Sequence, residues 1–158
     1  MDSVVRLHFE RAENELVLAE IIYDITGNKE IQQNVFHVNN VQSFYSAAIT
    51  HAYYSIFYCA KAYLLHKGIK IEAPNEHKKT YDEFEKIVLT GVIDVELLKI
   101  YKEMIIKADV LLGIFKLEKD KRGEYTYQKL SQANMMPALE SINHAKVFFK
   151  NMVNLIEF

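Results

Sequence analysis

The stretch Phe44–Leu65 (FYSAAITHAYYSIFYCAKAYLL) constrains the fold more than any other part of the chain. Its 22 residues include no Gly or Pro, and only His51 and Lys61 can carry a charge. Small and aromatic side chains are interleaved on every face of a helix built from this stretch, which is typical of a helix surrounded by other helices. It is long enough to span a bilayer, but Lys61 and the many hydroxyl groups argue against a membrane span. The stretch therefore predicts the central helix of a bundle, ending at Gly68.

Composition is consistent with one all-α domain over residues 1–158. Half of the residues are apolar and a quarter are charged, as in ordinary globular proteins. The chain has only five Gly and two Pro residues, which favours long helices over a β architecture with many turns. The formal net charge of −2 gives no general attraction to nucleic acid, so any site for a polyanion must be a local patch.

Four further helices are predicted from apolar residues at three- and four-residue spacing. They are expected at residues 3–26, at 75–89 (or from Lys78), at 95–121 and, capped by Ser131 or Asn134, up to 156. The first helix has an apolar stripe of Val5, Phe9, Ala12, Leu16, Ala19 and Tyr23, and its charges, Glu10, Arg11, Glu13, Glu15 and Glu20, fall mostly elsewhere, as on a solvated face. The last helix tolerates Pro137 in its first turn, and its stripe is expected to contain Ala138, Ile142, Ala145, Phe149, Met152 and Ile156. Residues 28–41 are less regular and are expected to form a linker with a short helical turn. The predicted fold is an up-and-down bundle of four main helices plus one shorter helix.

The single cysteine and the N-terminal residues bear on location. Cys59 lies inside the central helix, cannot form an internal disulfide, and is expected to be a small buried hydrophobic residue rather than a reactive thiol. The first residues carry charges of both signs and lack the long apolar core of a signal peptide. A cytoplasmic location is therefore expected.

Common catalytic and metal-binding patterns are absent from the sequence. There is no Gly-rich phosphate loop, CxxC pair, HExxH motif or nucleophile elbow. The Glu-x-x-His pattern of di-iron bundles is also missing, and His8 with Glu10 lacks partners at metal spacing. Because these patterns are missing, the sequence predicts no catalytic group, no bound metal and no cofactor.

Two local basic segments remain as candidates for binding. One follows the central helix and comprises Lys67, Lys70, His77, Lys78 and Lys79. The other combines cations with two tyrosines: Lys116, Lys119, Lys121, Arg122, Tyr125, Tyr127 and Lys129. Cations beside aromatic rings suit nucleotide phosphates and bases, although a solvated helix end gives the same pattern.

His51 is the ambiguous residue of the central helix. A buried histidine must find a hydrogen-bonding partner, and several tyrosine hydroxyls are expected within reach of it in a bundle core. Two interpretations stay open: a packed, hydrogen-bonded core histidine, or the floor of a cleft.

The run SAAITHAYYSIFYCAKAYLLHKGI resembles the second helix of HEPN-domain proteins, in which small residues precede Tyr-Tyr-x-x-Phe and an Ala- and Leu-rich turn ends in Gly. Other segments follow in the family's order, namely the opening LHFERAENELVLAEII, Glu76-His77-Lys78, Thr90-Gly91-Val92-Ile93-Asp94 and Arg122-Gly123-Glu124-Tyr125. The resemblance extends from about residue 4 to residue 156.

The resemblance implies an up-and-down bundle that forms an isologous homodimer and binds a nucleotide or RNA. It also implies a minimal nucleotidyltransferase as a partner chain, in a toxin–antitoxin-like pair. The binding candidates are then Arg122, Tyr125, Lys121, Lys119, His77 and His51.

Some members of the family are metal-independent ribonucleases that use an Arg followed four to six residues later by a His. No His follows Arg122 at this spacing, so a non-catalytic binding module is expected. Two alternatives remain: a structural bundle for dimerisation or partner binding, and a ribonuclease toxin.

Overall fold

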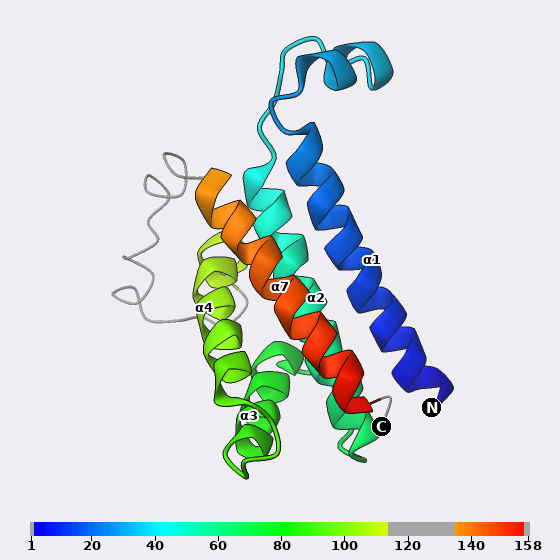
Figure 1. Ribbon diagram of the computed structural model, residues 1–158, viewed down its shortest axis with the longest axis vertical. Coiled ribbons are helices and arrows are strands. Elements are labelled where there is room, and N and C mark those ends of the chain that lie inside the picture. The colour runs from blue at the N-terminus through cyan, green and yellow to red at the C-terminus, as the bar shows by residue number, and fades with distance from the viewer. Residues whose placement is uncertain (1, 114–134, 157–158) are drawn as a thin grey trace.

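A computed structural model describes residues 2–113 and 135–156 of the chain. All regular structure in these residues is helical, in the order α1 (Ser3–Ile25), η1 (Ile31–Val35), α2 (Tyr45–His66), α3 (Glu76–Val88), α4 (Val95–Leu112) and α7 (Met135–Ile156). The four long helices form a bundle with α3 packed at one end (Figure 1). This confirms the predicted all-α fold, with α3 as the shorter helix and η1 as the helical turn of the linker.

α2 lies at the centre of the bundle and contacts α1, α3, α4 and α7. Its small residues Ala48, Ala52, Ala60 and Ala62 are fully buried, and small side chains at such contacts let helix axes approach closely. Cys59 is also fully buried, as predicted, and this burial raises the pKa of its thiol. No helix in the described part of the chain is long and apolar enough to cross a membrane.

α1 packs one stripe against α2 and α7. Its first turn is capped by Asp2, whose Oδ1 accepts a 2.8 Å hydrogen bond from the Val4 N–H, as expected of an N-cap aspartate. Its buried residues recur at three- and four-residue spacing, as predicted: Val5, Phe9, Ala12, Leu16 and Ala19.

The connection between α1 and α2 projects from one end of the bundle (Figure 1) and is held by Gln32. This side chain is 1% exposed. Its Nε2 donates to the carbonyls of Ile25 (2.7 Å) and Gln42 (2.9 Å), and its Oε1 accepts from the Gln42 N–H (2.7 Å). The amide thus forms hydrogen bonds with backbone groups of Ile25 and Gln42 that have no partner within a helix. Gly27, with φ of +71°, makes the turn out of α1.

α4 is shorter than predicted. It begins after Asp94, whose Oδ1 accepts from the Glu96 N–H at 2.9 Å, and it ends at Leu112. Gly113 adopts a left-handed conformation with φ of +63° and its N–H donates to the Asp109 carbonyl. Such a glycine ends a helix, so the prediction that this helix runs to residue 121 was wrong.

α7 accommodates Pro137 in its first turn, as predicted. Its buried stripe differs from the prediction at one point. Phe148 is fully buried against Phe84, with ring centroids 5.5 Å apart, whereas the predicted Phe149 is only partly buried and meets Phe9 edge-on. Phe148 therefore packs against α3, whereas its neighbour Phe149 packs against α1.

Candidate functional site

The first turn of α3 places His77 against α2. The His77 Nδ1 and the Tyr53 hydroxyl share a hydrogen bond of 2.8 Å. The His77 ring also stacks on Phe57, with centroids 4.1 Å apart and planes 22° apart, and it meets Tyr54 edge-on at 5.8 Å. One histidine thus contacts three aromatic residues of the central helix.

Burial sets the protonation of this pair. It lowers the pKa of His77, a shift partly opposed by the Glu76 carboxylate. Burial raises the pKa of Tyr53, and nearby Tyr101, Tyr54 and Asp109 add to the shift. Both groups are therefore neutral near pH 7, since a low dielectric disfavours their charged forms.

Tyr54 continues the aromatic contacts towards α1. It stacks with Tyr58 at 6.4 Å and 28°. Tyr58 is flanked by two residues of α1: its ring stacks with His8 at 6.2 Å and 16°, and the Arg11 Cζ lies 4.7 Å from its centroid. This Arg11 contact is in the range of a cation–π interaction. We refer to Tyr53, His77, Phe57, Tyr54, Tyr58 and His8 as the aromatic ladder.

His51 lies one turn before Tyr54 on the same stripe of α2 and pairs with α1. Its Nδ1 donates to Glu15 Oε2, because a carboxylate only accepts hydrogen bonds. The other oxygen of Glu15 is 3.9 Å from Arg11 Nε. The predicted partner of His51 was a tyrosine hydroxyl, which was wrong: His51 is half-buried at the edge of the bundle, within reach of an acidic residue of α1.

Lys61 and Glu76 fix α3 beside the ladder. Lys61 Nζ donates to Glu76 Oε2 at 2.7 Å, and this bond lowers the pKa of Glu76. Lys61 and His8 also line a pocket of about 300 Å³ between α1, α2 and the residues after α2, walled by Val4, Leu65, Ile69 and Ile71. Lys70 and Asp2 also line this pocket, so the ladder ends beside a pocket with three nitrogen-bearing side chains and one carboxylate.

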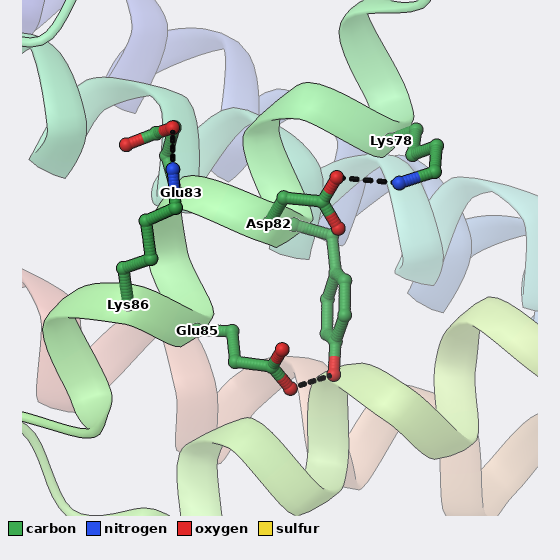
Figure 2. A network of polar contacts seen from close by, with 6 residues as sticks. Lys78, Asp82, Glu83, Glu85 and Lys86 are labelled. Atoms are coloured by element: carbon green, nitrogen blue, oxygen red, sulfur yellow. Dashed lines mark hydrogen bonds and ion pairs between the residues drawn. The ribbon is translucent and has the colours of Figure 1, made fainter.

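Two lysines of the basic segment after α2, Lys70 and Lys78, pair with carboxylates. Lys70 pairs with Glu72 at 2.9 Å, and Lys79 Nζ donates to the Glu72 carbonyl. Lys78 Nζ lies 2.6 Å from Asp82 Oδ2, and the Tyr81 hydroxyl donates to Glu85 on the same helix. Figure 2 shows the pairing of Lys78 with Asp82. These contacts fit a solvated face, and His77 alone of this segment points into the ladder.

The six predicted binding residues fall into two groups. His77 belongs to the ladder, and His51 lies on the same stripe of α2 as Tyr54 and Tyr58. The other four, Lys119, Lys121, Arg122 and Tyr125, lie outside the described residues.

Sequence reasoning missed the contribution of α1. His8, Arg11 and Glu15 recur at three- and four-residue spacing, which places them on one face of a helix. Arg11 and Glu15 were assigned to a solvated face, and His8 was considered only as a metal ligand with Glu10. Their partners, Tyr58 and His51, lie on another helix. Spacing within one helix carries no information about such pairings.

The model of the HEPN domain family matches residues 33–111, half of the chain. The matched region contains α2, α3 and nearly all of α4, and with them Tyr53, Tyr58 and His77. The chain belongs to the HEPN domain family.

One relative among curated proteins is "Putative toxin MJ0142" of Methanocaldococcus jannaschii. It is 31% identical over 102 residues, which cover 64% of this chain and 61% of the relative. The chain therefore matches somewhat less than two thirds of that protein's length. No solved structure matches the chain.

Proposed function

We propose that this HEPN module binds a nucleotide or RNA at the outer part of the aromatic ladder, without cleaving it. The observation that carries the proposal is the group of Tyr58, His8 and Arg11, where two rings and a guanidinium meet at a partly exposed surface. Family membership supports it. Lys119, Lys121, Arg122 and Tyr125 are proposed to contribute further cations and a ring to the same ligand.

The chemistry of these groups suits a nucleotide. A base stacks on an exposed aromatic ring, and this stacking tolerates any base because each has a π-face. The Arg11 side chain is 60% exposed and its contact with Glu15 is long, at 3.9 Å, so its N–H groups remain accessible to a phosphate. A guanidinium pairs with phosphate oxygens through charge-assisted hydrogen bonds.

The test is a titration of the full chain with ATP and with short single-stranded RNA, followed by backbone NMR shifts. Shifts at Tyr58, Arg11 and His8 are expected in wild type and are lost in Tyr58→Ala. Tyr45→Ala is the matched control, because Tyr45 is also a partly buried tyrosine of α2, at the end away from the ladder. No shifts at the ladder with millimolar ligand, or equal binding by both variants, contradicts the proposal.

We also propose a toxin–antitoxin-like pairing, with this chain as a homodimer beside a minimal nucleotidyltransferase in the cytoplasm. It is supported by family membership and by the word toxin in the name of the M. jannaschii relative. Co-expression with the product of the neighbouring reading frame and light scattering of the purified material test it. A monomer that recovers no nucleotidyltransferase contradicts both parts.

A second candidate, a metal-independent ribonuclease, is favoured by the contact between His51, Glu15 and Arg11. Cleavage of this kind needs a base to take the proton of the ribose 2′-hydroxyl, whose oxygen then attacks phosphorus as the 5′-oxygen leaves. It also needs a cation to stabilise charge on the phosphorane. His51 held by Glu15 supplies the first group, and Arg11 the second.

Incubation with tRNA and mRNA in EDTA tests this second candidate. If it holds, His51→Ala and Arg11→Ala each abolish cleavage, while His66→Ala, which alters an exposed histidine at the end of α2, does not. The Arg122→Ala variant shows whether that residue takes part. An inert wild-type protein excludes the ribonuclease and leaves the binding proposal standing.

A further inference from the structure

Four polar side chains face one another between α4 and α7, away from the aromatic ladder. Glu103 and Lys107 belong to α4, and Glu140 and His144 belong to α7. Each pair has i, i+4 spacing, so each lies on one face of its helix. An ion pair joins the helices, with Lys107 Nζ 3.4 Å from Glu140 Oε1, and His144 Nδ1 lies 3.9 Å from Glu103 Oε2.

Three of these residues converge with atoms that bind metals. Glu103, Glu140 and His144 each offer a nitrogen or a carboxylate oxygen, and the three atoms lie within 4.8 Å of one another. His144 Nδ1 is buried and has no hydrogen-bond partner among the described residues. A buried ring nitrogen without a partner is costly, and coordination of a cation would satisfy it.

Lys107 is the fourth member and is 3% exposed. Its Nζ also lacks a hydrogen-bond partner within the described ranges, although it faces Glu140. A buried ammonium is tolerated only beside a negative charge, and Lys107 meets this requirement by pairing with one oxygen of Glu140. The second oxygen of Glu140 is left for another partner, as when an outer group orients a ligating carboxylate.

We propose that Glu103, Glu140 and His144 form a site for a divalent transition metal of the zinc class. One histidine nitrogen and two carboxylate oxygens are ligands that zinc accepts, and three protein ligands leave a position for water. Zinc–ligand distances of about 2.0–2.2 Å require the three atoms to draw closer than 4.8 Å. Glu140 can make this movement because its side chain is long and 55% exposed.

Sequence spacing alone could not reveal this site. Glu140 and His144 form a pair at i, i+4, but the third ligand, Glu103, comes from another helix. The prediction of no metal was drawn from motifs within one segment. A bound ion would link α4 to α7. In the sequence, these two helices precede and follow residues 114–134, which include Arg122 and Tyr125.

The experiment uses the full chain, freed of metal with EDTA and then dialysed. Zn²⁺ affinity is measured by competition with a chromophoric chelator, and Co²⁺ binding by its visible absorption. We expect saturable binding of one ion per chain and a higher melting temperature with Zn²⁺. Since loss of an outer-shell partner alone costs about 10–100-fold in metal affinity, His144→Ala and Glu103→Gln should each weaken binding at least about tenfold.

Two matched controls report on adventitious binding. His66→Ala and Glu13→Gln remove an exposed histidine and an exposed glutamate elsewhere on the surface, and they should leave the Zn²⁺ affinity unchanged. Circular dichroism checks that each variant is folded, with His144→Asn as a second variant at that position. The proposal is overturned if wild type shows no saturable Zn²⁺ binding, or if folded His144 and Glu103 variants bind as wild type does.

Discussion

The two ends of the aromatic ladder use the same residue types in different surroundings. At the inner end, Tyr53 is 0% exposed and bonds to His77, whose ring is held against Phe57. At the outer end, Tyr58 is partly exposed and is flanked by His8 and Arg11 from α1. Both ends pair a tyrosine with a histidine, yet only the outer end presents a ring and a cation to solvent.

The difference shows that burial assigns the role of each ring. A buried ring with a satisfied hydroxyl contributes to folding through its area and its hydrogen bond. A partly exposed ring remains accessible to a ligand and contributes less to folding. Stability should therefore depend mainly on the inner end, and affinity for a nucleotide mainly on the outer end.

The largest expected effect is on stability at the inner end. Tyr53→Ala should lower the free energy of unfolding by about 3–5 kcal/mol, because it removes a large aromatic side chain from the core. Tyr53→Phe keeps the ring but leaves His77 Nδ1 without this bond, and should cost about 1–3 kcal/mol. Urea unfolding followed by circular dichroism measures both. A cost below 1 kcal/mol for Tyr53→Ala would break the distinction between the two ends.

The next effect is on affinity at the outer end. Tyr58→Ala should weaken binding of short RNA by about 1–3 kcal/mol, the range for one base stacked on an aromatic ring. Its unfolding free energy should change by only about 1 kcal/mol or less. Fluorescence anisotropy with labelled RNA and a parallel urea series give the two numbers. A variant that loses stability and keeps affinity would reverse the assignment.

A smaller effect concerns pH. Burial lowers the pKa of His77 and of His8 below the ordinary histidine value, so the unfolded chain binds protons at a pH where the folded chain does not. The unfolding free energy should therefore fall as pH is lowered from 7 towards 5.

Part of this dependence should disappear in His77→Gln, while exposed His66→Gln should leave it intact. Urea unfolding at several pH values measures the slope. An unchanged slope in His77→Gln would mean that the inner histidine is not held neutral by its surroundings.

The smallest expected effect is on the salt dependence of RNA binding. If Arg11 neutralises one phosphate, Arg11→Ala should reduce the slope of log K against log salt by about 0.7. Arg6→Ala is the matched control, since Arg6 is also an exposed arginine of α1 and pairs with Glu10 one turn on. Equal slopes for both variants would remove Arg11 from the binding surface.

Sequence reasoning predicted the fold well because most of the fold depends on periodic burial. The α1 stripe from Val5 to Ala19 and the burial of most of α2 follow from spacing and residue size, although the α2 stripe with His51 and Tyr58 stays partly exposed. The end of α4 was misplaced because the predicted helix was carried through Gly113, a residue whose left-handed conformation stops the helix. Phe148 and Phe149 were confused because adjacent residues are only about 100° apart around a helix, and each of these two rings packs against a different helix.

The candidate site was predicted less completely. His77 was identified within a segment of cations. Its partners Tyr53 and Phe57 lie on successive turns of α2, a different helix, and the sequence pattern did not show this contact. Arg11 and Glu15 were assigned to the solvated face of α1, since only the packing of α1 on α2 brings them to Tyr58 and His51. Contacts between helices depend on rotation and register, which a single helix pattern does not specify.

The tip held by Gln32 lies at the opposite end of the bundle from the start of α1 and the end of α7 (Figure 1). Near those two helix ends, Arg6, Phe9 and Ile156 line a common pocket. The start of α1 and the end of α7 therefore lie close together in the folded protein. A circular permutant that joins the two ends by a short flexible linker and opens between Asn39 and Asn40 would keep all five α-helices intact within the described residues.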